Sequence, residues 1–324
     1  MEHFSHFNAQ TVDDAVSILR RYGDRAHIIA GGTDLIGKMK DRILPRYPEA
    51  LVNIKAIPSL GSIQMRNGMA SIGPLCTLDE IARSEIIEGH WPAVARAAAR
   101  AASPHLREMG TIGGNICQDI RCWYYRQPEN RFPCLRKGGG KCYAINGDNR
   151  FHSIFGGSVE EGCYAVHPSD AAPALVALDG RVKTTKRTVS IEDFFTVSIE
   201  KTTILDLDEI VTEIQLPLPA EGTKSAFGKF ALRSSIDFPI VNCAAAVTLS
   251  KGKVAAARIC LNAVYVRPYR PAASEEAILG KPLTEENVEL AADASVSGAR
   301  PLSRNRYMVQ IARTMVKRVL LACS

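Results

Sequence analysis

The chain contains 324 residues, of which 46% are hydrophobic and 23% are charged. These fractions are typical of soluble globular proteins, so they exclude a disordered or fibrous chain. The length predicts two or three domains. The 40 basic and 34 acidic residues leave a net charge of +6, and the basic residues are spread along the chain. Because nucleic-acid-binding surfaces need clustered basic residues, we expect no nucleic-acid partner.

The N-terminal residues, MEHFSHFN, lack the basic and then apolar order of a secretory signal. No stretch approaches about 18 uninterrupted apolar residues, so we expect no membrane-spanning segment. The nine cysteines then indicate a reducing compartment, and we expect a cytoplasmic protein. Four cysteines are isolated in the sequence and are expected to be buried as small apolar side chains: Cys76, Cys243, Cys260 and Cys323.

Residues 1–57 predict a small βαβ-like lobe. Thr11 is suited to cap a helix that begins at Val12 and ends near Gly23. Apolar runs at 27–30 and 51–54 predict strands.

A change of pattern after Pro58 predicts a second lobe over residues 58–217. Strands at 62–65 and 69–72 flank Asn67-Gly68, a pair typical of a tight hairpin turn. An alanine-rich helix is expected over 91–103. Later in this lobe, a small-residue apolar segment at 171–177 precedes a strand over 210–216.

Residues 218–324 predict a C-terminal domain of antiparallel strands followed by helices. Strands over 241–249 and 254–265 flank a turn at Lys251-Gly252-Lys253, and Ser274 and Thr284 are candidate helix caps. The final helix has one apolar face that we expect to pack against the domain: Met308, Ile311, Ala312, Met315, Val316 and Val319.

Two similar glycine pairs stand out, in Ala30-Gly31-Gly32-Thr33-Asp34 and in Thr111-Ile112-Gly113-Gly114-Asn115. Glycine lets backbone N–H groups approach a phosphate closely, because no Cβ blocks the way. Neither sequence is the G-x-G-x-x-G fingerprint of a nicotinamide-binding unit. Each pair alone is more simply interpreted as a tight turn, whereas the two together favour a shared pyrophosphate site.

Four further cysteines, Cys122, Cys134, Cys142 and Cys163, are separated by 11, 7 and 20 residues. These gaps match neither the closely paired ligands of zinc sites nor the compact cysteine run of bacterial ferredoxins. Between Cys117 and Cys142 lie six basic residues and only two acidic ones. Such an excess of positive charge would offset a buried cluster held by thiolates. A structural zinc site, or a basic loop with incidental thiols, remains open.

Several neighbours of these cysteines have two interpretations. Cys117 is expected to pack beside the second glycine pair rather than to bind metal. His152 and His167 are interpreted as structural histidines rather than ligands. The aromatic run 123–125 could cover a cluster or belong to the core.

Four motifs, in this order, resemble the flavin-binding medium subunits of the molybdenum hydroxylases: the two glycine loops, His167-Pro168-Ser169-Asp170 and Asp208-Glu209-Ile210-Val211. The resemblance covers nearly the whole chain. It implies an α+β fold in which a two-lobed FAD-binding domain, similar to that of vanillyl-alcohol oxidase, precedes a C-terminal α+β domain. It also implies that this chain contributes no catalytic residue.

The resemblance implies that the glycine loops hold the FAD pyrophosphate, that Asp170 also contacts FAD, and that Val211 lies near the isoalloxazine. Lys229, four residues before Arg233, matches a family lysine. The implied cofactor-binding residues are Ile29, Ala30, Gly31, Gly32, Thr33, Asp34, Leu35, Ala101, Gly110, Thr111, Ile112, Gly113, Gly114, Asn115, Asp170, Val211 and Lys229.

Unlike most members of that family, this chain has an insertion at about 117–163, which holds the four cysteines. It looks like the insertion of the 4-hydroxybenzoyl-CoA reductases, which carries a 4Fe-4S cluster, and bacterial aldehyde oxidoreductases have a similar one. The resemblance therefore implies Cys122, Cys134, Cys142 and Cys163 as ligands of a 4Fe-4S cluster.

The resemblance further implies an electron-transfer subunit. Its partners would be a large molybdopterin-binding subunit and a small subunit with two 2Fe-2S clusters, in a dimer of heterotrimers. In a reductase, electrons would pass from an acidic ferredoxin, docked on an exposed basic insertion, through the cluster and FAD to molybdenum. In an aldehyde oxidoreductase they would flow the other way. A stand-alone flavin oxidase and a zinc-stabilised binding module are the remaining alternatives.

Overall fold

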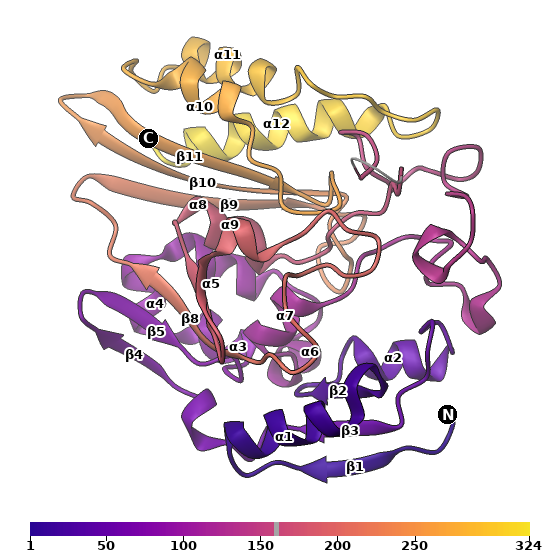
Figure 1. Ribbon diagram of the computed structural model, residues 1–324. Coiled ribbons are helices and arrows are strands. Elements are labelled where there is room, and N and C mark those ends of the chain that lie inside the picture. The colour runs from indigo at the N-terminus through magenta and orange to yellow at the C-terminus, as the bar shows by residue number, and fades with distance from the viewer. Residues whose placement is uncertain (159–161) are drawn as a thin grey trace.

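The computed structural model describes residues 1–158 and 162–324. It contains three sheets that follow one another along the chain, each with its own helices. In Figure 1 the N-terminal sheet lies at the bottom, the central sheet in the middle and the C-terminal sheet at the top, with residues 118–158 as loops on the right. Within the described residues, no helix combines the length and the apolarity needed to cross a bilayer.

The N-terminal lobe is a parallel sheet with strand order β1-β3-β2. Its elements are β1 (Ser5–Asn8), α1 (Val12–Tyr22), β2 (Ala26–Ile29), α2 (Leu35–Lys40) and β3 (Ala50–Asn53), and a 3-10 turn η1 (Gly23–Arg25) follows α1. The Thr11 hydroxyl accepts a hydrogen bond from Asp14 N, so the predicted cap of α1 is confirmed. Strand β1 is missing from the sequence prediction, because this edge strand shows no alternation of buried and exposed residues.

The central sheet is antiparallel, with strand order β4-β5-β8-β6-β7. Its strands are β4 (Ile63–Arg66), β5 (Met69–Ile72), β6 (Arg181–Thr184), β7 (Thr188–Ser190) and β8 (Val211–Pro217). The predicted hairpin between β4 and β5 is confirmed, since Asn67 and Gly68 both have positive φ, at 50° and 74°.

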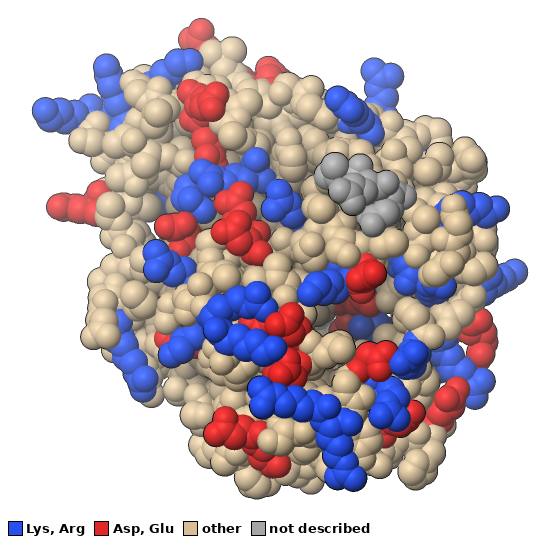
Figure 2. All heavy atoms as spheres, viewed as in Figure 1, with Lys and Arg blue, Asp and Glu red and all other residues tan. Residues whose placement is uncertain are grey.

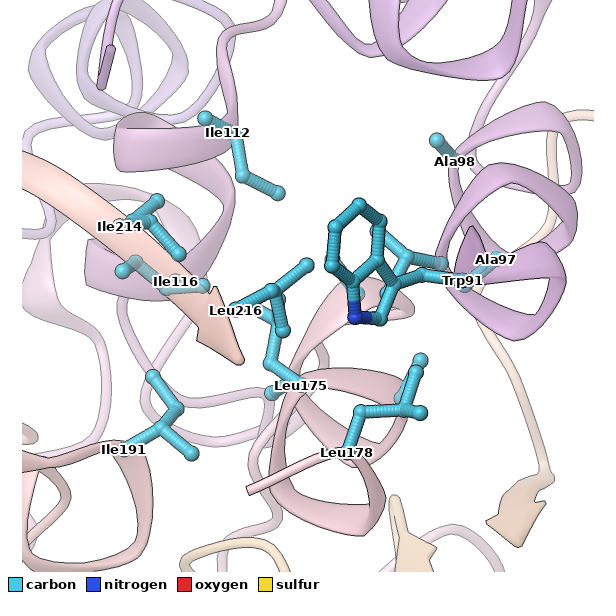
Figure 3. Close-up of a cluster of buried hydrophobic side chains, with 14 of the residues drawn as sticks. Trp91, Ala97, Ala98, Ile112, Ile116, Leu175, Leu178, Ile191, Ile214 and Leu216 are labelled. Atoms are coloured by element: carbon cyan, nitrogen blue, oxygen red, sulfur yellow. The ribbon is translucent and has the colours of Figure 1, made fainter. Parts of the chain in front are cut away.

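The helices of this lobe are α3 (Leu78–Arg83), α4 (Glu85–His90), α5 (Pro92–Ala99), α6 (Pro104–Met109), α7 (Ile112–Cys117), α8 (Ala171–Ala177) and α9 (Ile191–Phe194), with the 3-10 turn η2 (Pro58–Leu60) before β4. The Trp91 ring is fully buried among Leu175, Leu178 and Leu216 (Figure 3), and its Nε1 donates to Pro217 O at 2.9 Å. The helix predicted over 91–103 is too long. It ends at Ala99, the backbone leaves the right-handed helical conformation at Ala102, whose φ is 45°, and Pro104 starts a new helix, α6.

The C-terminal sheet is antiparallel with order β11-β10-β9, formed by β9 (Thr223–Phe230), β10 (Val241–Ser250) and β11 (Lys253–Asn262). It is covered by α10 (Ala272–Ile278), α11 (Glu285–Ser295) and α12 (Tyr307–Leu321) (Figure 1). The predicted cap at Thr284 and the packing face of α12 are confirmed. The cap at Ser274 is wrong, because this residue lies inside α10, where its buried hydroxyl donates to Ala291 O.

The cysteine-rich segment leaves the central lobe and returns to it through one β-bridge. Arg121 N donates to Val166 O at 2.8 Å, and Val166 N donates to Arg121 O at 3.1 Å. Two short 3-10 turns, η3 (Pro128–Asn130) and η4 (Leu135–Lys137), are its only regular structure within the described residues. On the face shown in Figure 2, basic and acidic side chains are intermingled, as the spread of charge along the sequence predicts.

Candidate functional site

The two glycine loops meet where the N-terminal lobe contacts the central lobe. The first loop follows β2, and the second follows α6. A Cβ added to Gly31 would lie 2.0 Å from Met109 O and 3.1 Å from the Cα of Gly110, the residue just before the second loop. No larger residue can occupy position 31 without separating the loops. The structure thus brings together two motifs that are far apart in the sequence.

The second loop forms the first turn of α7. The Thr111 hydroxyl accepts from Gly114 N at 3.1 Å and so fixes the turn. Gly113 N donates to Pro74 O at 2.9 Å, and a Cβ at this position would lie 2.7 Å from Pro74 Cβ. Gly113 is therefore required for packing. At Gly114, by contrast, an added Cβ would meet only the Thr111 hydroxyl oxygen that caps the helix.

Two cavities adjoin at these loops. The first, of about 350 Å³, lies between β2, the loops and the segment before β8, and the second is about 190 Å³. Both are lined by Thr33, Asp34, Thr111, Gly114 and Gln118. Together they exceed the lower size limit of pockets for small molecules and cofactors. Bare backbone at the junction suits the close approach of a pyrophosphate.

Most residues implied as cofactor-binding line these cavities. The first cavity is lined by Ile29, Ala30, Gly31, Gly32, Thr33, Asp34, Leu35, Thr111, Gly113, Gly114 and Val211. The second is lined by Ala101, Gly110, Asn115 and Asp170 together with shared residues. Two predicted residues line neither cavity. Ile112 is fully buried in the core of the central lobe, and Lys229 lies behind Asp170.

Asp170 and Lys229 form a buried ion pair. Lys229 Nζ lies 2.7 Å from Asp170 Oδ2, and the two side chains are 4% and 6% exposed, respectively. Asn242 donates to the other carboxylate oxygen at 2.8 Å, and Lys229 also donates to Arg100 O. Lys229 therefore does not line the second cavity itself, but it holds the Asp170 carboxylate that does.

Val211 is positioned by the segment that precedes it, residues 205–210. The buried Glu209 carboxylate accepts from Arg187 Nε at 2.8 Å and from the Thr184 hydroxyl. The Arg187 hydrogen bond lowers the pKa of Glu209 to about 2. The next residue, Ile210, packs into the core of the N-terminal lobe. This segment therefore attaches the wall of the first cavity to both lobes.

Several residues that line the two cavities could not be recognised as site residues from the sequence. His27 and Lys38 line the first cavity, and burial, with a smaller effect from Lys38, lowers the pKa of His27 to about 4. Asp237 and Phe238 reach the second cavity from the loop between β9 and β10. That loop is held by Ile236, whose φ of 67° is unusual for a β-branched residue and whose N donates to Ala102 O.

The four predicted metal ligands, Cys122, Cys134, Cys142 and Cys163, line one cavity of about 10 Å³, which we call the thiol cavity. That volume is about the size of one water molecule, so a cluster would require the thiols to open outward. In residues 1–158 and 162–324, no three His, Cys, Asp or Glu side chains surround a single metal position. The described residues therefore form no closed metal site, neither for zinc nor for iron, in this arrangement of the thiols.

The chemistry of the donor set suits an anionic cluster. Arg136 Nε donates to Cys163 Sγ at 3.3 Å, and His152 Nε2 lies 3.2 Å from Cys122 Sγ. Lys137 Nζ is buried without a hydrogen-bond partner among the described residues. Burial raises the pKa of Cys122 to about 12, so metal binding would have to release its proton. The iron-sulfur cluster stays a prediction.

Several basic residues of the cysteine-rich segment are less exposed than the sequence predicts. Arg136 is buried and donates to Ser198 O and Ile199 O. Lys137 Nζ lies 5.0 Å from the centre of the Tyr125 ring, and Arg126 pairs with Asp34. Three of the six cations thus face inward, and the exposed basic docking surface expected from the sequence is smaller than predicted.

The other cysteines behave as predicted. Cys76, Cys243, Cys260 and Cys323 are buried. Cys117 lines the first cavity and not the thiol cavity. Tyr124 and Tyr125 line the thiol cavity, whereas Trp123 is 43% exposed.

The matches to known protein families together cover nearly the whole chain. Residues 2–219 match the family described as "FAD binding domain in molybdopterin dehydrogenase", and residues 226–323 match "CO dehydrogenase flavoprotein C-terminal domain". The carbon monoxide dehydrogenase medium chain of Hydrogenophaga pseudoflava is 29% identical over 321 residues, which are 98% of this chain and 96% of that one. The aldehyde oxidoreductase FAD-binding subunit PaoB of Escherichia coli is 29% identical over 332 residues, with 99% and 98% covered.

A solved structure gives the same result for the fold. The chain superimposes on a carbon monoxide dehydrogenase from Hydrogenophaga pseudoflava that lacks the Mo-pyranopterin moiety, with a TM-score of 0.79 and 28% identity. The match covers 99% of this chain and 97% of that one. The predicted fold, an FAD-binding domain followed by a C-terminal domain of mixed helix and sheet, is confirmed.

Proposed function

Since the chain belongs to the family of FAD-binding medium subunits of molybdenum hydroxylases, we propose that it carries electrons, by way of FAD, between the partner subunits of such an enzyme. The meeting of the two glycine loops at Gly31 and Met109, above two adjoining cavities, is the observation that supports this most directly. Bound FAD would supply the ability to take electrons singly or in pairs.

The chain's own residues would bind and orient the flavin. Backbone groups of the glycine loops would receive the pyrophosphate, and Val211 would pack in the first cavity. Asp170, held by Lys229 and Asn242, would present its carboxylate to the second cavity. The substrate reaction would take place on a molybdopterin-binding large subunit, with a 2Fe-2S small subunit as the intermediate carrier, in a cytoplasmic dimer of heterotrimers.

Absorption spectroscopy of the purified chain tests the flavin assignment. We expect the wild-type chain to show flavin bands and to bind about one FAD. The variant Gly114→Val should lose this FAD, because the valine side chain would fill the junction of the cavities. Gly37→Val is the control, because an added Cβ there meets no atom within 4 Å. A well-folded, colourless wild-type chain that does not bind added FAD contradicts the proposal.

For the cysteine-rich segment, we propose a 4Fe-4S cluster bound by the four thiols of the thiol cavity. Four thiols around one cavity, with Arg136 donating to Cys163 and Lys137 buried nearby, support an anionic group. Iron and sulfide analysis should give about four of each per chain, and Cys134→Ser should lose them. Cys260→Ser, outside the thiol cavity, should keep them. Stoichiometric zinc instead of iron contradicts this assignment.

For the whole enzyme we propose a 4-hydroxybenzoyl-CoA reductase, which removes the phenolic hydroxyl with electrons from a ferredoxin. The support is the resemblance of the inserted segment. A bacterial aldehyde oxidoreductase is the second candidate, and the similarity to PaoB over 99% of the chain favours it. Assays of the purified complex with 4-hydroxybenzoyl-CoA plus reduced ferredoxin, and with aromatic aldehydes plus an electron acceptor, distinguish the two.

A further inference from the structure

We propose that Asp34, Lys38, Asp119 and Arg126 form an ionic bridge that couples FAD binding to cluster retention, so that each cofactor strengthens the binding of the other. This inference rests on the proposed function, because it assumes that FAD binds the first cavity and that a cluster binds the thiol cavity. The bridge itself consists of contacts between this chain's own residues. It connects the first glycine loop to the cysteine-rich segment.

Arg126 is the central residue of this bridge. Its guanidinium donates to three acceptors: Asp34 Oδ1 at 2.7 Å, Ile120 O at 2.9 Å and Asp119 O at 2.9 Å. Its backbone N donates to Cys122 O at 3.0 Å. Arg126 therefore joins the glycine loop to the backbone of a proposed cluster ligand.

A second set of contacts runs parallel to the first. Asp34 Oδ2 accepts from Asp119 N at 3.0 Å, so both oxygens of this carboxylate bind the start of the cysteine-rich segment. Lys38 Nζ lies 3.4 Å from Asp34 Oδ2 and 3.3 Å from Asp119 Oδ2, and its side chain is only 11% exposed. Asp34 and Lys38 both line the first cavity, so this end of the bridge faces the flavin site.

Tyr125 completes the connection to the thiol cavity. Its hydroxyl donates to Asp119 Oδ2 at 2.6 Å, while its ring lines the thiol cavity. Although burial opposes ionisation, Lys38 and Arg126 hold the pKa of Asp119 well below its usual range, so the carboxylate stays charged. Tyr125, Asp119 and Lys38 thus form an unbroken chain of contacts from one cavity to the other.

The expected consequence is reciprocal. FAD fixes the loop that carries Asp34, and that loop holds the segment that carries Cys122. Binding of either cofactor therefore orders part of the segment that binds the other cofactor, so the second binding step loses less conformational entropy. Coupling between two sites is reciprocal by thermodynamic necessity, and typical values change affinity about 5- to 150-fold. Ion pairs that are largely removed from solvent are also less screened by salt than surface pairs.

The test measures cluster loss to an iron chelator by the decay of visible absorption, in protein with FAD and after removal of FAD. We expect FAD to slow the loss about tenfold in the wild type and less than about twofold in Arg126→Gln. Arg150→Gln is the matched control. Arg150 lies in the same segment and pairs with Asp148, without a contact to the glycine loops. It should behave as the wild type does.

The reverse measurement is FAD affinity with and without the cluster, the latter in Cys134→Ser. We expect cluster loss to weaken FAD binding at least about fivefold in the wild-type background and to have little effect beside Arg126→Gln. The factor need not equal the slowing of iron loss, because reciprocity holds for equilibrium affinities and not for rates. If Arg126→Gln fails to fold, Tyr125→Phe removes only the hydroxyl bond to Asp119 and should reduce the coupling.

Two outcomes overturn the inference alone. One is a wild type that holds both cofactors but loses iron equally fast with and without FAD. The other is full coupling retained in both Arg126→Gln and Tyr125→Phe. A wild type that binds neither flavin nor iron contradicts the proposed function instead, so the two failures are distinguishable.

Discussion

At the scale of single residues, Gly31 shows how one missing side chain positions the site. Its Cα lies so close to Met109 O that a methyl group would overlap backbone, which cannot move away as a side chain can. We expect Gly31→Ala to weaken FAD binding at least tenfold and to lower the free energy of unfolding by about 1–3 kcal/mol. Flavin titration and urea unfolding measure both effects.

The matched control is Gly37→Ala in α2, where an added methyl group meets no atom within 4 Å. Alanine is favoured over glycine inside a helix by about 0.5–1 kcal/mol, so this variant should be slightly stabilised and should bind FAD normally. Equal FAD affinity in Gly31→Ala and Gly37→Ala would contradict the assigned role of Gly31.

The buried pair of Asp170 and Lys229 gives a second prediction at this scale. Lys229→Met leaves the Asp170 carboxylate without its cation, and breaking a buried pair in this way typically costs about 3–5 kcal/mol. Asp170→Asn combined with Lys229→Met removes both charges and should recover most of that loss. Urea unfolding of the single and double variants measures this, and additive losses would contradict it.

Residue chemistry was predictable from the sequence only where the signal is local. The two Gly-Gly motifs and the four cysteines are visible as patterns, and the structure gathers each set around a cavity. By contrast, whether Arg126 faces solvent or Asp34 depends on contacts between distant segments. Asp237 and Phe238 reach the second cavity from another domain's loop, which no local pattern reveals.

At the scale of elements, the segment before β8 joins two lobes through Glu209. The hydrogen bond from Arg187 lowers the folded-state pKa of Glu209 to about 2, whereas an unfolded glutamate titrates near 4.5. The unfolded chain therefore binds more protons between these values. The stabilisation is fully present above about pH 4.5 and is lost as the pH falls towards 2.

We expect Glu209→Gln to lower the free energy of unfolding by about 2 kcal/mol at neutral pH, because it removes a charge-assisted hydrogen bond. The difference from wild type should shrink below pH 4.5 and vanish near pH 2. Denaturant unfolding across this range measures it. A difference that does not change with pH would assign the loss to packing rather than to the charge.

Elements with local signals were also the ones that the sequence predicted well. Thr11 caps α1, and Asn67-Gly68 turns the hairpin, because both effects are set by neighbouring residues. The edge strand β1 and the short helix α6 were missed, and the helix predicted over 91–103 ends earlier, at Ala99. Edge strands are specified by their partners, and no C-capping glycine marks the end of α5 in the sequence.

At the scale of the whole molecule, the first cavity draws its walls from both the N-terminal and the central lobe. A ligand there binds only when the lobes are assembled, so FAD should stabilise both together. At a free FAD concentration of about 100 times the dissociation constant, the gain is about 2.7 kcal/mol. Calorimetry should show one transition that shifts to lower temperature on removal of FAD. A shift confined to part of the unfolding enthalpy would contradict joint stabilisation.

The bridge between Arg121 and Val166 closes the cysteine-rich segment, but a second bridge, between Phe155 and Arg300, joins the segment to the C-terminal domain. Asn305 adds hydrogen bonds to His152 O and Ser153 O. A graft of this segment into a relative that has no such excursion would therefore need more than a closed loop, although the entropy of loop closure itself grows only slowly with length. The recipient would need matching partners in its own C-terminal domain and an acidic side chain where Asp34 stands, to pair with Arg126.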